Sequence, residues 1–252
     1  MSLEIAGLGL VVGIFVGLSG VGAGVLMAPT LILLGFHPSI AIGTDLAYGS
    51  VTKLVGTWRN AAHRLVNRTW VLWMTLGSVP GTAAGTEITQ LMPHGVAEHF
   101  LRIALAVVLV VASLAIVAKE VLALRGILPR PVDLAETRPW LICVVAGMVG
   151  FLVGLTSIGS GSLFMLFLLT FSGLGPREAV ATDIANAAAL SAVAALLHLA
   201  NGTVDIPLAG NLLVGSVPGI LLGSRLAHHV PARPLKLGIA LLVLLGGVKM
   251  LA

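Results

Sequence analysis

The chain has 252 residues, of which 58% are hydrophobic and only 10% are charged. A soluble domain carries about a quarter charged residues, so this composition excludes a soluble enzyme or regulatory domain and predicts an integral membrane protein. The formal charge of +4 does not indicate nucleic acid, because cytoplasmic loops of membrane proteins carry an excess of Lys and Arg. The single Cys143 excludes an intrachain disulfide and a cysteine metal cluster.

The first apolar segment, residues 5–34, is interrupted by GLSGVGAG at 17–24. Each glycine inside a helix costs about 1 kcal/mol relative to alanine, so we expect two short helices joined by an irregular tip. Later apolar segments approach the roughly 20 residues that cross a bilayer as a helix. They lie at 39–60, 69–88 and 98–118, then, after a polar stretch, at 140–171 (also glycine-broken), 178–199, 206–224 and 235–251.

Three blocks of sequence recur in the same order. VGIFVGLSGVGAG (12–24) aligns with VGFLVGLTSIGSG (149–161), AIGTDLA (41–47) with AVATDIA (179–185), and GSVPG (77–81) with GSVPG (215–219). Such internal similarity indicates repeated structural units. We therefore predict a first membrane repeat at 1–118, a cytoplasmic linker at 119–137 and a second membrane repeat at 138–252.

Basic residues occupy different turns in the two halves. In the first half they follow the second segment (Arg59, Arg64, Arg68), whereas the counterpart at 199–205 has no Lys or Arg. In the second half they fall one turn later (Arg225, Arg233, Lys236), and the counterpart at 86–95 has none. Because Lys and Arg mark the cytoplasmic side, this swap predicts inverted halves, with both termini in the periplasm.

Inversion requires each half to cross the membrane an odd number of times, so the glycine-broken segment must return to the side that it left. The predicted fold is an all-α integral membrane protein of two inverted homologous repeats, each with a glycine-broken helical hairpin plus three transmembrane helices. Irregular backbone at membrane depth is tolerated where it is buried in protein or lines a cavity. The tips are therefore expected near the bilayer midplane.

Interrupted helices in inverted repeats often present their N-termini to an anionic substrate in secondary transporters. We expect two such N-termini, after Gly24 and Gly161, to hold a small oxyanion, since glycine permits close backbone approach. The alternative is that these glycines only permit close helix packing. The candidate ligands in the tips are Ser19, Gly20, Gly22, Gly24, Thr156, Ser157, Gly159, Ser160, Gly161 and Ser162.

Each half also carries a Thr-Asp pair within its next segment, Thr44-Asp45 and Thr182-Asp183. An intramembrane carboxylate is by default a functional candidate, so Asp45 and Asp183 are either helix-end partners or coupling sites for a proton or sodium. Lys53 could neutralise an anion, pair with Asp45 or snorkel toward the basic turn. Thr44, Lys53, Thr182 and Asn186 complete the candidate substrate site.

Two enzyme-like patterns carry little weight. GLSG (17–20) matches a pattern of intramembrane serine proteases, but its partner reads GLTS and no histidine is specified as its base. No phosphate-binding loop of the Walker type occurs. We therefore expect no enzymatic activity, no cofactor, no metal and no nucleic acid partner.

The segments MAPTLILLGFHPSIAIGTDLA (27–47), GSVPGTAAGT (77–86) and GSVPGILLGSRLA (215–227) make the chain resemble the TauE/SafE family. The resemblance implies a secondary transporter in the bacterial inner membrane that exports sulfite, sulfoacetate or related organosulfonates. It places the family threonine at Thr44 and Thr182, and the glycine loops at Gly20, Gly22, Gly24, Gly159 and Gly161. The alternatives are a membrane subunit or binding protein that needs a partner, or an intramembrane hydrolase.

Overall fold

The computed structural model describes residues 3–19, 26–124, 134–161, 163–226 and 232–251. Every regular element within these ranges is a helix, which confirms the all-α prediction. The helices of the first half are α1 (Leu3–Ser19), α2 (Met27–Leu33), α3 (Pro38–Ala62), α4 (Arg68–Gln90) and α5 (His94–Leu124). They are followed by α6 (Leu134–Thr137), α7 (Pro139–Thr156), α8 (Leu163–Phe171), α9 (Pro176–Ala200), α10 (Ile206–Leu226) and α11 (Ala232–Leu251).

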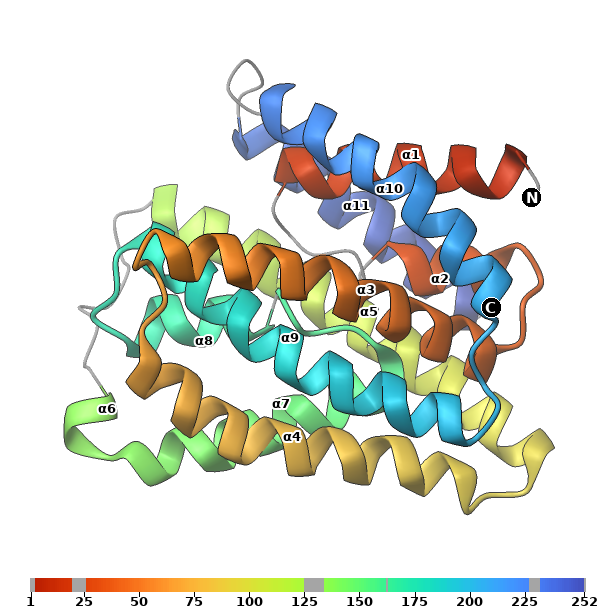
Figure 1. The fold of residues 1–252 in the computed structure, drawn as a ribbon, viewed down its shortest axis with the longest axis horizontal. Coiled ribbons are helices and arrows are strands. Elements are labelled where there is room, and N and C mark those ends of the chain that lie inside the picture. The colour runs from red at the N-terminus through yellow and green to blue at the C-terminus, as the bar shows by residue number, and fades with distance from the viewer. Residues whose placement is uncertain (1–2, 20–25, 125–133, 162, 227–231, 252) are drawn as a thin grey trace.

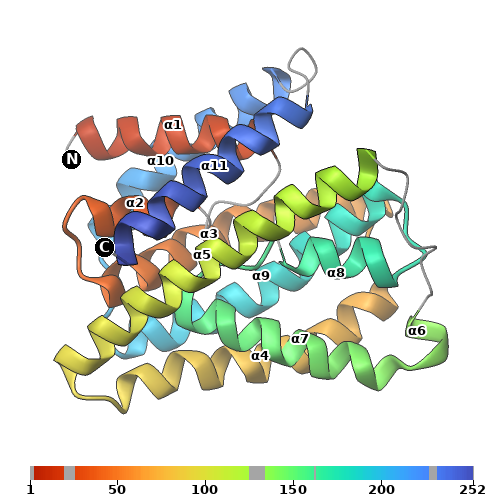
Figure 2. The same ribbon diagram turned by 180° about the vertical axis from the view of Figure 1, so that it is seen from behind.

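Both glycine-rich segments separate two helices, as the sequence predicts. α7 has 18 residues and α8 has 9, which correspond to about 27 Å and about 14 Å of helix. Figures 1 and 2 show that α8 ends on the side of the molecule where α7 begins, and that α2 likewise ends on the side where α1 begins. This path is the one that a hairpin requires.

The two halves pack by crossed pairing. α1 lies along α10 on one side of the molecule and α4 lies along α7 on the other, while α3 and α9 run between these pairs (Figure 1). α5 and α11 form a further pair between the halves. Each half thus covers the broken segment of the other, an arrangement consistent with two repeats related by a twofold axis.

The GSVPG blocks make these close pairings possible. A methyl group added at Gly77 would overlap the carbonyl oxygen of Cys143, and one added at Gly215 would overlap that of Ala6. Cys143 and Ala6 occupy equivalent positions in the two aligned segments. Small residues let membrane helices approach until their backbones touch, so these glycines serve helix packing.

Four helical stretches in the described ranges are long and apolar enough to cross a membrane: Gly95–Leu114, Pro139–Thr156, Arg177–Ala200 and Ile206–Gly223. α1 is also apolar over Leu3–Leu18 but shorter. α5 continues six residues past 118, into the predicted linker, because AKEVLAL offers residues with good helix propensity. The exact repeat boundaries and the inverted orientation stay predictions.

Candidate functional site

The centre of the molecule is an antiparallel crossing of α3 and α9 (Figures 1 and 2). At this crossing Lys53 of α3 donates from Nζ to Ser191 Oγ of α9 at 2.9 Å and to Ser160 Oγ at 3.0 Å. Ser191 occupies the position in the second half that Lys53 occupies in the first. One cation therefore lies where the two halves meet, and it also contacts the second glycine tip.

The second tip has a defined backbone shape. Ser157, Gly159 and Gly161 all have positive φ, of 62°, 120° and 124°. The amides of Leu163 and Phe164 both donate to the carbonyl oxygen of Gly159, at 3.1 and 3.2 Å, which closes the first turn of α8. By contrast, the amides of Gly159, Ser160 and Gly161 donate no hydrogen bond to any described residue.

Two carboxylates lie near Lys53, and one of them, Asp45, also contacts this tip. Asp45 is 2% exposed and accepts a 2.5 Å hydrogen bond at Oδ2 from the hydroxyl of Ser157. Asp183 is 4% exposed. The Oδ1 atoms of both have no hydrogen-bond partner among the described residues, and both carboxylates lie close enough to Lys53 to interact with it electrostatically. Unpaired buried acceptors carry a desolvation cost, so these oxygens are open to a proton, a cation or water.

The Thr44 and Thr182 hydroxyls bind the backbone of the opposite half. Thr44 Oγ1 accepts from the amide of Asp205 at 3.0 Å, and Thr182 Oγ1 accepts from the amide of Asn67 at 3.1 Å. Asp205 and Asn67 in turn accept at their side chains from Leu208 and Trp70, in the first turns of α10 and α4. The two threonines therefore fix the starts of α10 and α4, which is a structural contact that their proposed role in substrate binding did not anticipate.

Asn186 lies in a polar cluster between α9 and α4. Its Oδ1 accepts from Ser78 Oγ at 2.8 Å and from Thr75 Oγ1 at 3.3 Å, and its Nδ2 has no partner among the described residues. The repeat places Tyr48 opposite Asn186 and Ser216 opposite Ser78. The hydroxyls of Tyr48 and Ser216 are buried and have no described partner.

The remaining candidates are placed as follows. Thr156 Oγ1 donates to the carbonyl oxygen of Leu152 at 2.7 Å and accepts from the amide of Ile158 at 3.2 Å, so it stabilises the tip itself. Ser19 ends α1, and its side chain lies outside what the structure describes. The first-tip candidates Gly20, Gly22 and Gly24, together with Ser162, also lie outside the described residues.

The structure thus brings together one part of the predicted set. Ser157 bonds Asp45, Lys53 bonds Ser160 of the same tip, and Asp183 lies in electrostatic range of Lys53. Sequence reasoning did not identify Ser78 or Thr75. The signal for Ser78 was present, since it is the second residue of GSVPG and recurs as Ser216.

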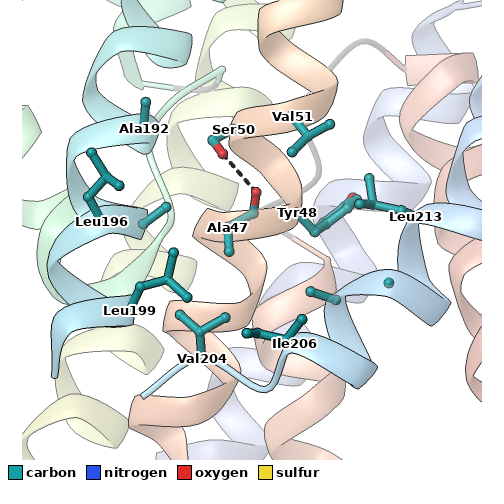
Figure 3. Close-up of a pocket in the computed structure, with 13 residues that line it drawn as sticks. Ala47, Tyr48, Ser50, Val51, Ala192, Leu196, Leu199, Val204, Ile206 and Leu213 are labelled. Carbon is teal, nitrogen blue, oxygen red and sulfur yellow. Dashed lines mark hydrogen bonds between the residues drawn. The ribbon is translucent and has the colours of Figure 1, made fainter. Parts of the chain in front are cut away.

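A groove of about 500 Å³ lies beside this site, between α3, α9 and α10. Figure 3 shows Ala47 and Ser50 of α3 facing Ala192, Leu196 and Leu199 of α9, while Tyr48 points toward Leu213 of α10. Ser50 donates to the carbonyl oxygen of Ala47 at 2.7 Å and so offers no free donor into the groove. Because the groove is almost wholly apolar, it would not solvate an anion.

Comparison with known proteins agrees with this architecture. Residues 5–250 match the family described as sulfite exporter TauE/SafE. The chain is 39% identical to the probable membrane transporter protein YjnA of Bacillus subtilis (strain 168) over 255 residues, covering 100% of both chains. It is 26% identical to the probable membrane transporter protein YunE of the same organism, covering 97% of this chain and 95% of the relative. No solved structure matches it. The chain is therefore a multi-pass membrane protein that belongs to the TauE/SafE family of transporters.

Proposed function

We propose that this protein is a secondary transporter that exports small sulfur-containing anions, such as sulfite, sulfoacetate or related organosulfonates, across the bacterial inner membrane. The observation that carries the proposal is the position of Lys53. Its ammonium has three N–H donors, of which two reach Ser160 and Ser191. The third is available to a ligand at the level where the two halves meet.

The second glycine tip supplies the rest of the proposed anion site. The amides of Gly159, Ser160 and Gly161 have no described acceptor, and Ser160 is already in contact with Lys53. Consecutive amides in a turn with positive φ form a concave anion-binding surface, and a nearby ammonium strengthens it. A tetrahedral or trigonal oxyanion fits such a set of donors, because it presents several acceptor oxygens in a small volume.

Asp45 and Asp183 are the proposed coupling groups. Lys53 with two ionised carboxylates has a net charge of −1, and a bound monoanion would change it to −2. Uncompensated charge inside a membrane protein is costly, so a proton or sodium ion on one carboxylate would favour anion binding. The proposal thus links binding of the anion to binding of a proton or sodium ion at Asp45 or Asp183.

Substitution Lys53→Gln tests the site. Loss of one hydrogen bond to a charged group costs about 1.5–3 kcal/mol, so affinity for sulfite and sulfoacetate should fall about tenfold to hundredfold. The exposed Lys249→Gln, near the end of α11, is the matched control for removing a positive charge. Folded Lys53→Gln protein with wild-type affinity would overturn the proposed site.

Flux into liposomes that contain only this chain tests the activity. Net movement of either anion supports a complete transporter. Binding without flux would instead indicate a membrane subunit that requires a partner, and the proposal of a self-sufficient transporter would fail.

A further inference from the structure

The two halves make equivalent contacts in one place and differ in another. At the start of α4 the amide of Asn67 donates a hydrogen bond to the Thr182 hydroxyl. At the start of α10 the amide of Asp205 donates to the Thr44 hydroxyl in the same way. About three turns further along α4, the Ser78 hydroxyl donates a second hydrogen bond to α9, at Asn186 Oδ1. The equivalent contact from α10 to α3, through Ser216 to Tyr48, is not made.

Both partners of the missing contact are buried. Tyr48 and Ser216 are 0% exposed, and neither hydroxyl has a described partner. A buried hydroxyl without a partner costs roughly as much as a lost hydrogen bond. Such unpaired groups are uncommon in native structures and require an explanation.

The apolar groove lies between α3 and α10 at Tyr48, and its α10 side ends at Leu213, about one turn before Ser216. Its α10 wall consists of Ile206, Ala209, Gly210 and Leu213, with Val204 just before the helix, and its α3 wall includes Ala47, Tyr48 and Val51. α4 packs along α9 more extensively than α10 packs along α3. α10 is therefore attached to α3 at its start and separated from it beyond that point (Figure 3).

We propose that the structure represents one of two states, and that in the other α10 closes onto α3 across this groove, so that the Tyr48 hydroxyl bonds with Ser216. The Thr44–Asp205 contact is the fixed end of the movement. Because the repeats are related by symmetry, a matching change is expected in the other pair of helices: the Ser78–Asn186 hydrogen bond breaks when the Tyr48–Ser216 hydrogen bond forms. The groove is space for this movement rather than a path for the anion, because its lining is apolar. This inference rests on the proposed transport function.

Conservative substitutions distinguish a moving contact from a static one. Ser216→Ala and Tyr48→Phe remove hydroxyls that have no described partner in the present structure, in which the groove is open. The melting temperature of these variants should therefore not fall. Both should slow sulfoacetate flux about three- to tenfold, because they remove a hydrogen bond that only the closed state makes. Equilibrium affinity for sulfoacetate should stay within twofold.

Ser78→Ala is the matched control, because it breaks a bond that the structure already contains. It should lower the melting temperature, whereas Ser216→Ala should not. Wild-type flux in folded Ser216→Ala and Tyr48→Phe proteins would overturn the proposed closure. If the wild-type protein moves neither sulfite nor sulfoacetate, the proposed function itself fails.

A second measurement does not depend on flux. In a Cys143→Ser background, Ala47→Cys and Ala209→Cys place thiols on the two walls of the groove. Dibromobimane, which fluoresces when it bridges two nearby thiols, should bridge this pair. Bridging should stop transport, while each single-cysteine variant treated in the same way should remain active. Absence of bridging, or full transport after bridging, would overturn the proposal and favour a static groove occupied by lipid.

Discussion

Lys53 and Ser191 occupy the same position in the two halves of the chain and bond to each other, with Nζ and Oγ 2.9 Å apart. A residue on a twofold axis meets its own counterpart, so this contact places the proposed axis through the α3–α9 crossing. The halves differ at this point, since one contributes an ammonium and the other a hydroxyl. A single charge can therefore serve a single central site without a second, repelling lysine.

Removal of the Ser191 hydroxyl should loosen this centre. Ser191→Ala leaves Lys53 without one partner, and loss of a hydrogen bond to a charged group costs about 1.5–3 kcal/mol of stability. The measurement is the free energy of unfolding in detergent. Ser50→Ala is the control, because within the described residues the Ser50 hydroxyl bonds only the Ala47 carbonyl of its own helix. Equal, small effects of both substitutions would show that Lys53 does not depend on Ser191.

Asp45→Asn and Asp183→Asn test coupling. If either carboxylate carries the coupling proton, its replacement should abolish uptake driven by a pH gradient, while anion exchange at equal pH remains measurable. Asp205→Asn is the control for loss of a carboxylate, since Asp205 caps α10 and Asn can cap in its place. An unchanged response to the pH gradient in both single variants and in the double variant would restrict the two acids to a structural role.

The sequence predicted the helices well because long apolar segments and proline starts are local signals. Pro38 and Pro176 begin α3 and α9 within two residues of the expected positions. The crossed pairing of the halves was not predicted, because it depends on which backbones touch at the GSVPG glycines. The Asp45–Ser157 contact was also missed, since residues 112 positions apart meet only through the fold.

The threonines of the family motif provide a test between two roles. Thr44→Val and Thr182→Val remove the acceptors for the amides of Asp205 and Asn67, so each should lower stability by about 1 kcal/mol with little change in anion affinity. Thr170→Val is the control for replacing a hydroxyl with a methyl group, because the Thr170 hydroxyl bonds a carbonyl of its own helix. A loss of affinity without a loss of stability would instead make these threonines substrate ligands.

The inverted orientation predicts which side of the membrane each turn faces. Arg64, Arg130 and Arg233 should be cytoplasmic and both termini periplasmic. Single cysteines at residues 64, 130 and 233 in a Cys143→Ser background should resist a membrane-impermeant thiol reagent in intact cells and react after the inner membrane is opened. Labelling of residues 64 and 233 from the periplasm would contradict the inverted arrangement.

Gly159 is the most direct test of the glycine tip. Its φ of 120° disfavours any side chain, and an added methyl would lie 3.1 Å from Val153 Cγ2. Gly159→Ala should therefore both strain the tip and displace the amides from the anion, with a loss of about 1.5–3 kcal/mol in binding for one charge-assisted hydrogen bond, or about tenfold to hundredfold in affinity. We make the same prediction for Gly22→Ala in the first tip.

Gly7→Ala is the control for the two tip substitutions, since no neighbour lies within 4 Å of its added methyl. Affinity and melting temperature must be measured together, because pure packing glycines would lower only the melting temperature. Wild-type affinity in folded Gly159→Ala protein would show that the tip does not bind the anion.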